Sequence, residues 1–396
     1  MSSGLTGRQR TVLALVCAVA VSAVYGIQPV LEAAGDDLGL GEGALGRLAA
    51  AGQIGYLAGL VLLVPLGDLF DRRGLITAHL LLTAVGAGVA ATAPNGGVAI
   101  AGLALAGLFA VVVQTTVAYV AAVSPAGERG RDIGTVTSGV VVGILGVRVL
   151  SGTLGELADW RTAYLVIAGL CVTLAFAVRL TLGAETRRPR VRYGPLLASL
   201  GRLVVGDRLL LSRGLVAFFL FASFGTLWSG LALPLGAAPW RLGTTEIGLF
   251  GLAGLAGALG AARTGRWADR GLASSVTGWS LALLTASWLL IAQAGTSLWL
   301  LVVGVVVLDF AVQAVHVSSQ HLLTTAHPDR GSGVIGAYMV FYSLGSALGA
   351  VTTTWAHSVA GWPAASLFGA CYAALGLLTA LSTRRLTTPA RARSTP

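Results

Sequence analysis

The sequence predicts an all-α integral membrane protein built from two related halves. Of its 396 residues, 55% are hydrophobic and only 11% are charged, whereas a soluble domain carries about 25% charged residues. The apolar residues form long continuous runs, and a helix needs about 20 such residues to cross a bilayer. A membrane β-barrel would instead show segments of about ten residues with alternating polarity. The runs therefore predict membrane-spanning helices.

Twelve runs reach spanning length, which predicts twelve transmembrane helices. We place them at about 11–33, 44–66, 75–93, 98–122, 132–154, 162–182, 212–236, 245–264, 272–294, 298–322, 332–355 and 363–382. The first run is too long for the apolar part of a signal peptide, so we interpret it as a span. In the eighth run a glycine recurs at every third position from Gly248 to Gly260. This spacing predicts close approach of another helix.

A short charged segment occurs once in each half of the chain. Residues 67–75 read Gly-Asp-Leu-Phe-Asp-Arg-Arg-Gly-Leu, and residues 265–271 read Gly-Arg-Trp-Ala-Asp-Arg-Gly. Three residues correspond at one shift of 198 positions, half of the chain: Gly67, Asp71 and Arg72 match Gly265, Asp269 and Arg270. The repeat predicts two pseudo-symmetric six-helix bundles, at 1–183 and 212–384. A basic linker at 184–211 joins them, either flexible or carrying an interfacial amphipathic helix, and a tail follows at 385–396.

The positive charge of the chain is distributed unevenly between the predicted loops. The net charge is +10, and every basic residue is an arginine. Most of these arginines fall in loops on one side of the predicted bundle, which is the pattern of cytoplasmic loops. We therefore predict a multi-pass protein of the cell membrane with both termini in the cytoplasm.

The same composition excludes several classes of function. Arginines spread over short loops do not form the basic domain face that a nucleic-acid partner requires. The chain has no lysine, whereas a P-loop ends in Gly-Lys-Ser/Thr. The sequence therefore contains no ATP-binding P-loop. Its five histidines and three cysteines are scattered, so we expect no metal site and no cofactor. No catalytic constellation is visible, so we do not expect an enzyme.

Several segments resemble one known family. Residues 67–74 match the Gly-x-Leu-x-Asp-Arg-x-Gly loop motif of the major facilitator superfamily, and the resemblance extends over essentially the whole chain. Three further segments resemble a bacterial branch of drug or metabolite efflux permeases: Tyr-Gly-Ile-Gln-Pro-Val-Leu at 25–31, Arg-Gly-Arg-Asp-Ile-Gly at 129–134 and Asp-Phe-Ala-Val-Gln-Ala at 309–314. The resemblance implies the major facilitator fold, with a binding site between the halves.

The resemblance also implies a role for the repeated loop. The family's motif places its aspartate, here Asp71, in pairs with charges on neighbouring helices, which close an inner gate in one state. The implied gating residues are Gly67, Asp71, Arg72, Gly74, Gly265, Asp269 and Arg270. A topological anchor is the alternative. The chain departs from the drug:proton antiporter pattern because its fifth run lacks a Gly-Pro element, which leaves the direction of transport open.

Asp309 is the most informative single residue, since it lies near the middle of the tenth run. An ionised carboxylate at that depth is costly unless it is paired or hydrated. Asp309, Gln313, His316 and Gln320 share one helix face. Burial favours the protonated form of a carboxyl, so Asp309 is a candidate proton carrier. Glu32 and His316 are further candidates, and a hydrogen-bonded packing role is the alternative.

Arg148 lies deep in the outer part of the fifth run. Its buried guanidinium requires a hydrogen-bond acceptor. We expect this acceptor to be Asp309, Glu32 or an acid at the outer face, which the side chain would reach by snorkelling. Tyr25, Gln28 and Glu32 share a face of the first run. The candidate cavity residues are Tyr25, Gln28, Gln53, Gln114, Arg148, Trp228, Gln313, Tyr338 and Tyr342.

Together these features predict a secondary active transporter that works by alternating access. We expect proton-coupled efflux of a small amphiphilic drug or metabolite, by a monomer within the lipid bilayer. An uptake symporter or uniporter of the same fold is the first alternative. A membrane sensor that does not transport is the second, and the buried polar stripe argues against it.

Overall fold

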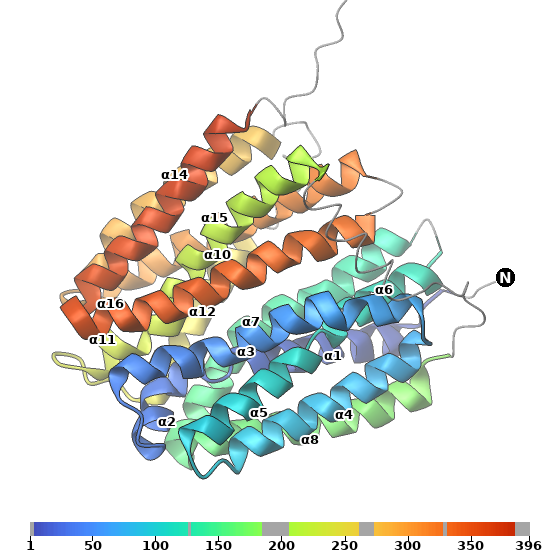
Figure 1. Cartoon of the computed structure of the whole chain (residues 1–396), viewed down its shortest axis with the longest axis horizontal. Coiled ribbons are helices and arrows are strands. Elements are labelled where there is room, and N and C mark those ends of the chain that lie inside the picture. Colours follow the sequence, from blue (N-terminus) through green and yellow to red (C-terminus); the bar gives the residue numbers. More distant parts are fainter. Residues whose placement is uncertain (1–3, 126–127, 184–205, 261–272, 328–330, 385–396) are drawn as a thin grey trace, which may run out of the picture.

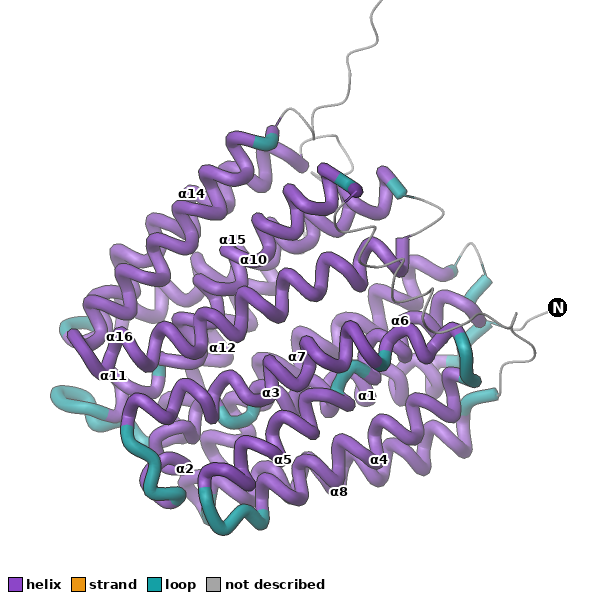
Figure 2. The backbone as a smooth tube through the Cα atoms, in the orientation of Figure 1, coloured by secondary structure: helices purple, strands orange, loops and turns teal. Residues whose placement is uncertain are grey.

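The described part of the chain folds into helices only. This computed structural model describes residues 4–125, 128–183, 206–260, 273–327 and 331–384, and no strand occurs among them. Short loops join the helices at their ends (Figure 2). The predicted all-helical class is therefore confirmed.

The helices form two groups that follow the chain (Figure 1). We call α1 to α8 the N-terminal half and α10 to α16 the C-terminal half. The N-terminal half holds α1 (Gly7–Tyr25), η1 (Gln28–Val30), α2 (Leu31–Asp37), α3 (Glu42–Leu62), η2 (Val64–Asp68), α4 (Arg72–Ala91), α5 (Gly96–Phe109), α6 (Val112–Val123), α7 (Arg129–Leu157) and α8 (Trp160–Thr181). The C-terminal half holds α10 (Arg208–Gly230), α11 (Ala232–Gly236), α12 (Thr244–Gly260), α14 (Ala273–Ile291), η5 (Ala292–Gly295), α15 (Leu298–Ala326) and α16 (Gly331–Ser382).

Ten helical segments of the described residues are long and apolar enough to cross a membrane. One of them is two helices in sequence, because α16 has non-helical backbone at Ala360 and Gly361. Gly361 has a φ of 70°, a conformation that glycine adopts without strain. A shorter apolar helix spans Thr244–Leu259, and residues 261–272 after it lie outside the described part. The membrane class is confirmed, and the count of twelve spans stays a prediction.

The first predicted span is interrupted where it approaches the other half. Helix α1 ends at Tyr25, and the 3-10 turn η1 begins at Gln28. Pro29 in that turn has no backbone N–H, so it cannot continue the helical hydrogen bonds. The bend separates α1 from α2 and brings η1 into contact with α10, α11 and α12 of the C-terminal half. It is this local geometry that positions Gln28.

Polar side chains define the starts of several helices. Thr6 accepts a hydrogen bond from the Gln9 backbone, and the Gln9 side chain accepts one from the Thr6 backbone, which forms a capping box. Side-chain caps also begin α4 at Asp71, α5 at Asn95, α8 at Asp159, α10 at Asp207 and α15 at Ser297. These caps satisfy backbone N–H groups that a helix leaves unpaired at its start.

The two halves meet along two helix pairs, α3 with α16 and α7 with α12. Glycines allow the close approach: a Cβ added at Gly248 would lie 2.5 Å from the carbonyl oxygen of Arg148, and one at Gly251 would lie 2.6 Å from that of Leu145. A Cβ added at Gly46 would collide with the Thr354 side chain. The predicted close approach at the glycines of the eighth run is confirmed.

These inter-half contacts lie toward one end of the molecule. We call it the α2 end, because it also holds α2, α11 and the starts of α3 and α12 (Figure 1). Among the described residues, hydrogen bonds join the halves at Tyr25–Tyr342, Gln28–Ser229, Thr244–Gly152 and Thr245–Glu156. The ribbons of the two halves diverge toward the opposite end (Figure 1). The halves are therefore closed against each other at the α2 end.

Candidate functional site

Arg148 lies at the centre of the contact between halves. Its side chain is 2% exposed, although α7 carries it in the middle of an apolar segment. Its Nη1 donates to the carbonyl oxygen of Ile144 at 2.6 Å, and its Nη2 donates to Oε1 of Gln28 at 2.9 Å. Its guanidinium carbon lies 3.9 Å from the ring centroid of Trp228 in the other half. Arg148 therefore joins α7, η1 and α10.

Asp309 lies against the same tryptophan from α15. Its carboxylate is buried and lies within reach of the indole Nε1 of Trp228, although neither Oδ2 nor Nε1 forms a hydrogen bond of normal geometry. A Cβ added at Gly254 would lie 2.7 Å from the indole of Trp228 and 3.1 Å from Oδ2 of Asp309. The glycine of α12 thus leaves room for both side chains. Asp309 attracts Arg148 through space. These two described side chains nevertheless form no ion pair within 4 Å.

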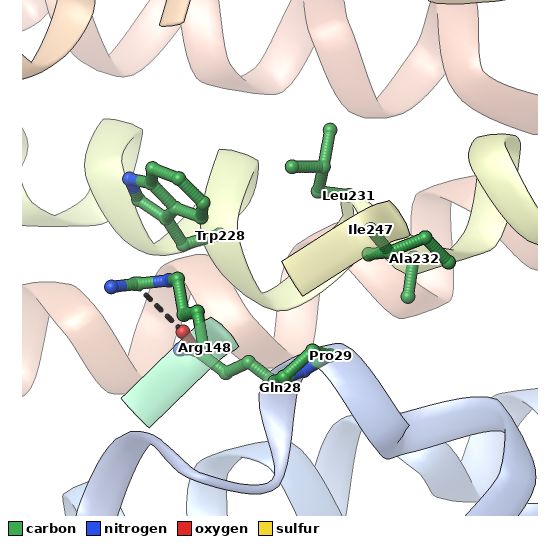
Figure 3. Close-up of a pocket in the computed structure, with 7 residues that line it drawn as sticks. All are labelled: Gln28, Pro29, Arg148, Trp228, Leu231, Ala232 and Ile247. Atoms are coloured by element: carbon green, nitrogen blue, oxygen red, sulfur yellow. Dashed lines mark hydrogen bonds between the residues drawn. The ribbon is translucent and has the colours of Figure 1, made fainter. Parts of the chain in front are cut away.

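A small cavity opens beside Arg148, with a volume of about 10 Å³. Its walls come from both halves (Figure 3). The lining residues are Gln28, Pro29, Arg148, Trp228, Leu231, Ala232 and Ile247. A cavity of this size holds no more than about one water molecule. Any larger ligand therefore requires the halves to move apart at this point.

Two further hydrogen bonds cross between the halves next to this cavity. Nε2 of Gln28 donates to Oγ of Ser229 at 3.2 Å, while Oε1 of Gln28 accepts from Arg148. The hydroxyls of Tyr25 and Tyr342 are hydrogen bonded to each other. With Trp228, five predicted cavity residues are thus brought together where the halves touch. Sequence spacing grouped Tyr25 with Gln28, but it could not group either of them with Arg148, Trp228 or Tyr342.

His316 belongs to a second polar group inside the C-terminal half. Its Nδ1 lies 3.0 Å from the hydroxyl of Tyr338, and its Nε2 lies 3.1 Å from Nε2 of Gln320. The ring of Phe221 packs edge-on against it at a centroid distance of 5.3 Å. These neighbours contact both ring nitrogens, and the proton-coupling role of His316 stays a prediction.

The remaining cavity candidates lie near these groups. Gln53 is buried with its amide next to the hydroxyl of Tyr25, although neither amide atom forms a hydrogen bond of normal geometry. Gln114 donates to the hydroxyl of Tyr56 at 3.2 Å. Gln313 is half-buried on α15, one turn beyond Asp309. Their roles as substrate contacts stay predictions.

Glu32 lies at the α2 end rather than beside Arg148. It is half-buried on α2, and a Cβ added at Gly236 of α11 would collide with its carboxylate. The expected partnership of Arg148 with Glu32 or Asp309 is therefore not formed within hydrogen-bond distance. Gln28 takes that place instead, because the bend after α1 carries its amide under the guanidinium.

The predicted gating loop is described only in the N-terminal half. Asp71 caps α4 by accepting from the backbone N–H of Gly74 at 2.9 Å. Asp71 and Arg72 also take part in further interactions, and Gly67 is buried. The second copy, with Gly265, Asp269 and Arg270, lies outside the described residues. The gating role stays a prediction.

Sequence reasoning missed two charged residues that the fold makes prominent. Arg213 on α10 is 1% exposed, and its Nε and Nη1 lack hydrogen-bond partners. Its position just inside the seventh predicted span was a usable signal. Glu156 at the end of α7 accepts from the backbone N–H of Thr245 at 3.0 Å. No sequence signal connected Glu156 with Thr245, since the two residues belong to different halves.

Comparison with known proteins identifies the family. Residues 13–271, more than half of the chain, match the model of the Major Facilitator Superfamily. The chain belongs to the Major Facilitator Superfamily. Its bent first span and its two-half arrangement are therefore those of a superfamily transporter, and the family predicted from the loop motif is confirmed.

Individual superfamily members resemble the chain over most of its length. An uncharacterized transporter of Escherichia coli O157:H7, YgaY, is 37% identical over 366 residues, covering 92% of this chain and 93% of the relative. A chloramphenicol resistance protein of Streptomyces lividans is 30% identical over 256 residues, covering 59% of this chain and 64% of the relative. The crystal structure of the human organic anion transporter MFSD10 superposes with a TM-score of 0.69 at 19% identity, covering 95% of this chain and 99% of that one. The last likeness concerns the fold alone.

Proposed function

We propose that this superfamily transporter exports a small amphiphilic compound in exchange for protons, by alternating access. The observation that carries the proposal is the buried carboxyl of Asp309 beside Trp228, with Oδ2 lacking a hydrogen-bond partner. A carboxylate at that depth is costly while ionised. Gaining or losing one proton there changes the net charge of the contact between halves.

The proposed cycle breaks and re-forms the contacts at the α2 end. Arg148 of the N-terminal half lies against Trp228 of the C-terminal half, and Asp309 packs on the same indole. When Asp309 is ionised, its attraction for Arg148 favours the closed arrangement. When Asp309 is protonated, that attraction is lost and separation of the halves costs less. Protonation would thereby bias which end of the transporter is open.

Export, rather than uptake, rests on the similarity to a chloramphenicol resistance protein. We propose the cell membrane as its location, a monomer as the working unit, and cytoplasmic termini. Accumulation of chloramphenicol and of a panel of amphiphiles in inverted and in right-side-out vesicles tests the direction. Export predicts proton-dependent accumulation in inverted vesicles, and accumulation only in right-side-out vesicles would contradict it.

The variant Asp309→Asn tests the coupling residue. An amide retains the shape of the carboxyl but cannot carry the proton. We therefore expect transport driven by a pH gradient to be lost, while exchange of compound for compound across the membrane continues without a gradient. The measurement is compound-induced proton flux in proteoliposomes that contain a pH-sensitive dye. Asp36→Asn is a matched control, because Asp36 is an exposed acid on α2. Unchanged gradient-driven transport by Asp309→Asn would contradict the assignment.

Proton cotransport is the second candidate, and a specific observation favours it. Arg148 has no acid within 4 Å among the described residues, so a proton on Asp309 would strengthen the positive potential at Arg148. A proton and a cargo with negative charge would then bind together, which is the coupling that cotransport requires. The same vesicle measurement separates this candidate from exchange.

A further inference from the structure

The Arg148 cavity points to the chemical class of the cargo. Resting on the proposed transport function, we infer that the transported compound carries an anionic group, a carboxylate or a similar oxyanion, attached to a flat apolar body. The anion would bind the Arg148 guanidinium, and the apolar body would pack against Trp228. The inference holds for either direction of transport.

The first step is the set of groups that surrounds the Arg148 guanidinium. Its two hydrogen bonds go to neutral oxygens, the carbonyl of Ile144 and the amide of Gln28. Its other close neighbours are aromatic rings, with centroids 3.9 Å away at Trp228 and 5.8 Å away at Tyr25. Buried charges are normally paired with an opposite charge. Arg148 therefore has an unfilled requirement for an anion.

The second step is the sign and geometry of the unpaired groups. Nε of Arg148 is a buried N–H donor without an acceptor, and Nε1 of Trp228 lies by the Asp309 carboxylate without forming a hydrogen bond of normal geometry. The free donor of Arg148 suits an acceptor, because a guanidinium edge binds an oxyanion through two parallel hydrogen bonds. A cationic cargo would be repelled, because the guanidinium already covers the face of Trp228. A neutral cargo would leave the charge of Arg148 unmatched.

The third step concerns Asp309, which is an acid close to the proposed anion site. It attracts Arg148 through space, but the two described side chains form no ion pair within 4 Å. The attraction lowers the positive potential at Arg148 without filling the donor positions of the guanidinium. An oxyanion can therefore reach Nε without displacing Asp309.

The fourth step is access to the cavity. Its volume of about 10 Å³ is too small for a carboxylate. Gln28, Pro29 and Arg148 come from one half, whereas Trp228, Leu231, Ala232 and Ile247 come from the other (Figure 3). Separation of the halves necessarily enlarges a space with such walls. The site would therefore accept its ligand in the arrangement in which the halves part beside Arg148.

The test uses the purified full chain in detergent and three series of probes on the same ring systems. Benzoate, 1-naphthoate and 4-phenylbenzoate carry a carboxylate; the matched amides are neutral, and the matched arylmethylamines are cations. Each probe is titrated to millimolar concentration while tryptophan fluorescence and the thermal unfolding temperature are followed. We expect the carboxylates to quench fluorescence and raise the unfolding temperature. The amides and amines should bind at least about tenfold more weakly, since a charged hydrogen bond contributes about 1.5–3 kcal/mol.

Variants attribute the binding to Arg148. Arg148→Gln should weaken carboxylate binding at least about tenfold, because the charge and the paired donors are removed. Arg148→Lys should weaken it less, because the charge remains, and it serves as the test if Arg148→Gln does not fold. Arg213→Gln is the matched control, since Arg213 is also a buried arginine with unpaired nitrogens but lies away from the cavity. Its binding of the carboxylates should stay unchanged.

Three outcomes would overturn the inference. They are equal binding of the amides or amines, full carboxylate binding by both Arg148 variants, and no binding of any carboxylate at millimolar concentration. Flux of the same probes into proteoliposomes separates this inference from the proposed function. Transport of amines or amides without transport of carboxylates would refute the anion and leave proton-coupled transport standing. Carboxylate binding without gradient-driven flux would support the anionic ligand and contradict proton-coupled transport.

Discussion

Two buried aspartates show how the surroundings of a single residue separate a structural role from a functional one. Asp132 on α7 is fully buried and accepts from Oγ of Ser124 and from Nε of Arg10, each at 2.7 Å. Asp309 is 2% exposed and has an oxygen without a partner. The first carboxylate is stabilised by two hydrogen bonds to its charged form, whereas Oδ2 of the second forms no hydrogen bond of normal geometry. Asp132 therefore joins α1 to α7, whereas Asp309 is suited to gain and lose a proton.

This contrast predicts opposite effects of the same substitution. Asp132→Asn removes the charge that pairs with Arg10, so the thermal unfolding temperature of the purified protein should fall by several degrees. Asp309→Asn removes a buried charge with few partners, so the unfolding temperature should stay unchanged or rise. Thermal unfolding of both variants in one detergent provides the measurement. A larger fall for Asp309→Asn than for Asp132→Asn would contradict the distinction.

At the scale of elements, the start of α12 is the part of the C-terminal half that depends most directly on the N-terminal half. Oγ1 of Thr244 donates to the carbonyl oxygen of Gly152 at 2.7 Å, and the Thr245 backbone donates to Glu156 at 3.0 Å. A carboxylate is favourable at a helix N-terminus, because the unpaired N–H groups there carry partial positive charge. Here that carboxylate belongs to α7 of the other half. The pair α7–α12 therefore holds the α2 end closed.

Removal of this carboxylate should loosen the α2 end. Glu156→Ala deletes the acceptor for Thr245, so the arrangement with a separated α2 end should become more populated. The readout is the rate at which a maleimide modifies a cysteine introduced at the buried cavity residue Ala232, in a chain that lacks the exposed Cys371. We expect faster labelling with Glu156→Ala, and a rate near the parent's with Glu156→Gln, which keeps an acceptor oxygen.

Glu246→Ala provides the matched control for that experiment. Glu246 is an acid in the first turn of the same helix, but it accepts from Gly243 within its own half at 2.9 Å. Its loss should leave the labelling rate unchanged. Equal acceleration by both alanine variants would show that α12 merely frays, and the inter-half role of Glu156 would then be wrong.

At the scale of the whole molecule, one closed end and two diverging halves are what alternating access requires (Figure 1). The pairs α3–α16 and α7–α12 close the α2 end through contacts in which glycines bring the backbones together. The proposed cycle of alternating access separates these pairs once in every turn. A covalent bond across either pair should therefore stop transport while the fold remains intact.

A disulfide between α3 and α16 tests this requirement. A Cβ added at Gly46 would touch the Thr354 side chain, so the double variant Gly46→Cys and Thr354→Cys should cross-link under oxidation. We expect proteoliposome transport to fall to background when the protein is oxidised and to recover when it is reduced. Each single variant is the control and should show no such dependence. Continued transport by the fully cross-linked protein would contradict alternating access at the α2 end.

Much of the architecture could be predicted, whereas the grouping of the candidate residues could not. Spans follow from apolar length. The break in the first span at Gln28 and Pro29 was not predicted, although the missing N–H of proline was a usable signal. The partner of Arg148 did not follow, because Gln28 is 120 positions away along the chain. The second copy of the charged loop lies outside the described residues, so the gate remains a prediction from sequence.

By itself, the sequence determined that this chain is a helical membrane protein and a member of a transporter superfamily, and it predicted a duplicated design. Those properties depend on composition, run length and local motifs, which are the same in every conformation. Only the tertiary structure decided that Arg148 pairs with Gln28 and Trp228 rather than with Asp309. It also decided that Asp132 is satisfied whereas Asp309 is not. Such pairings depend on which side chains of separate helices come within about 3 Å of each other. The spacing of residues along one helix does not predict the distances between helices.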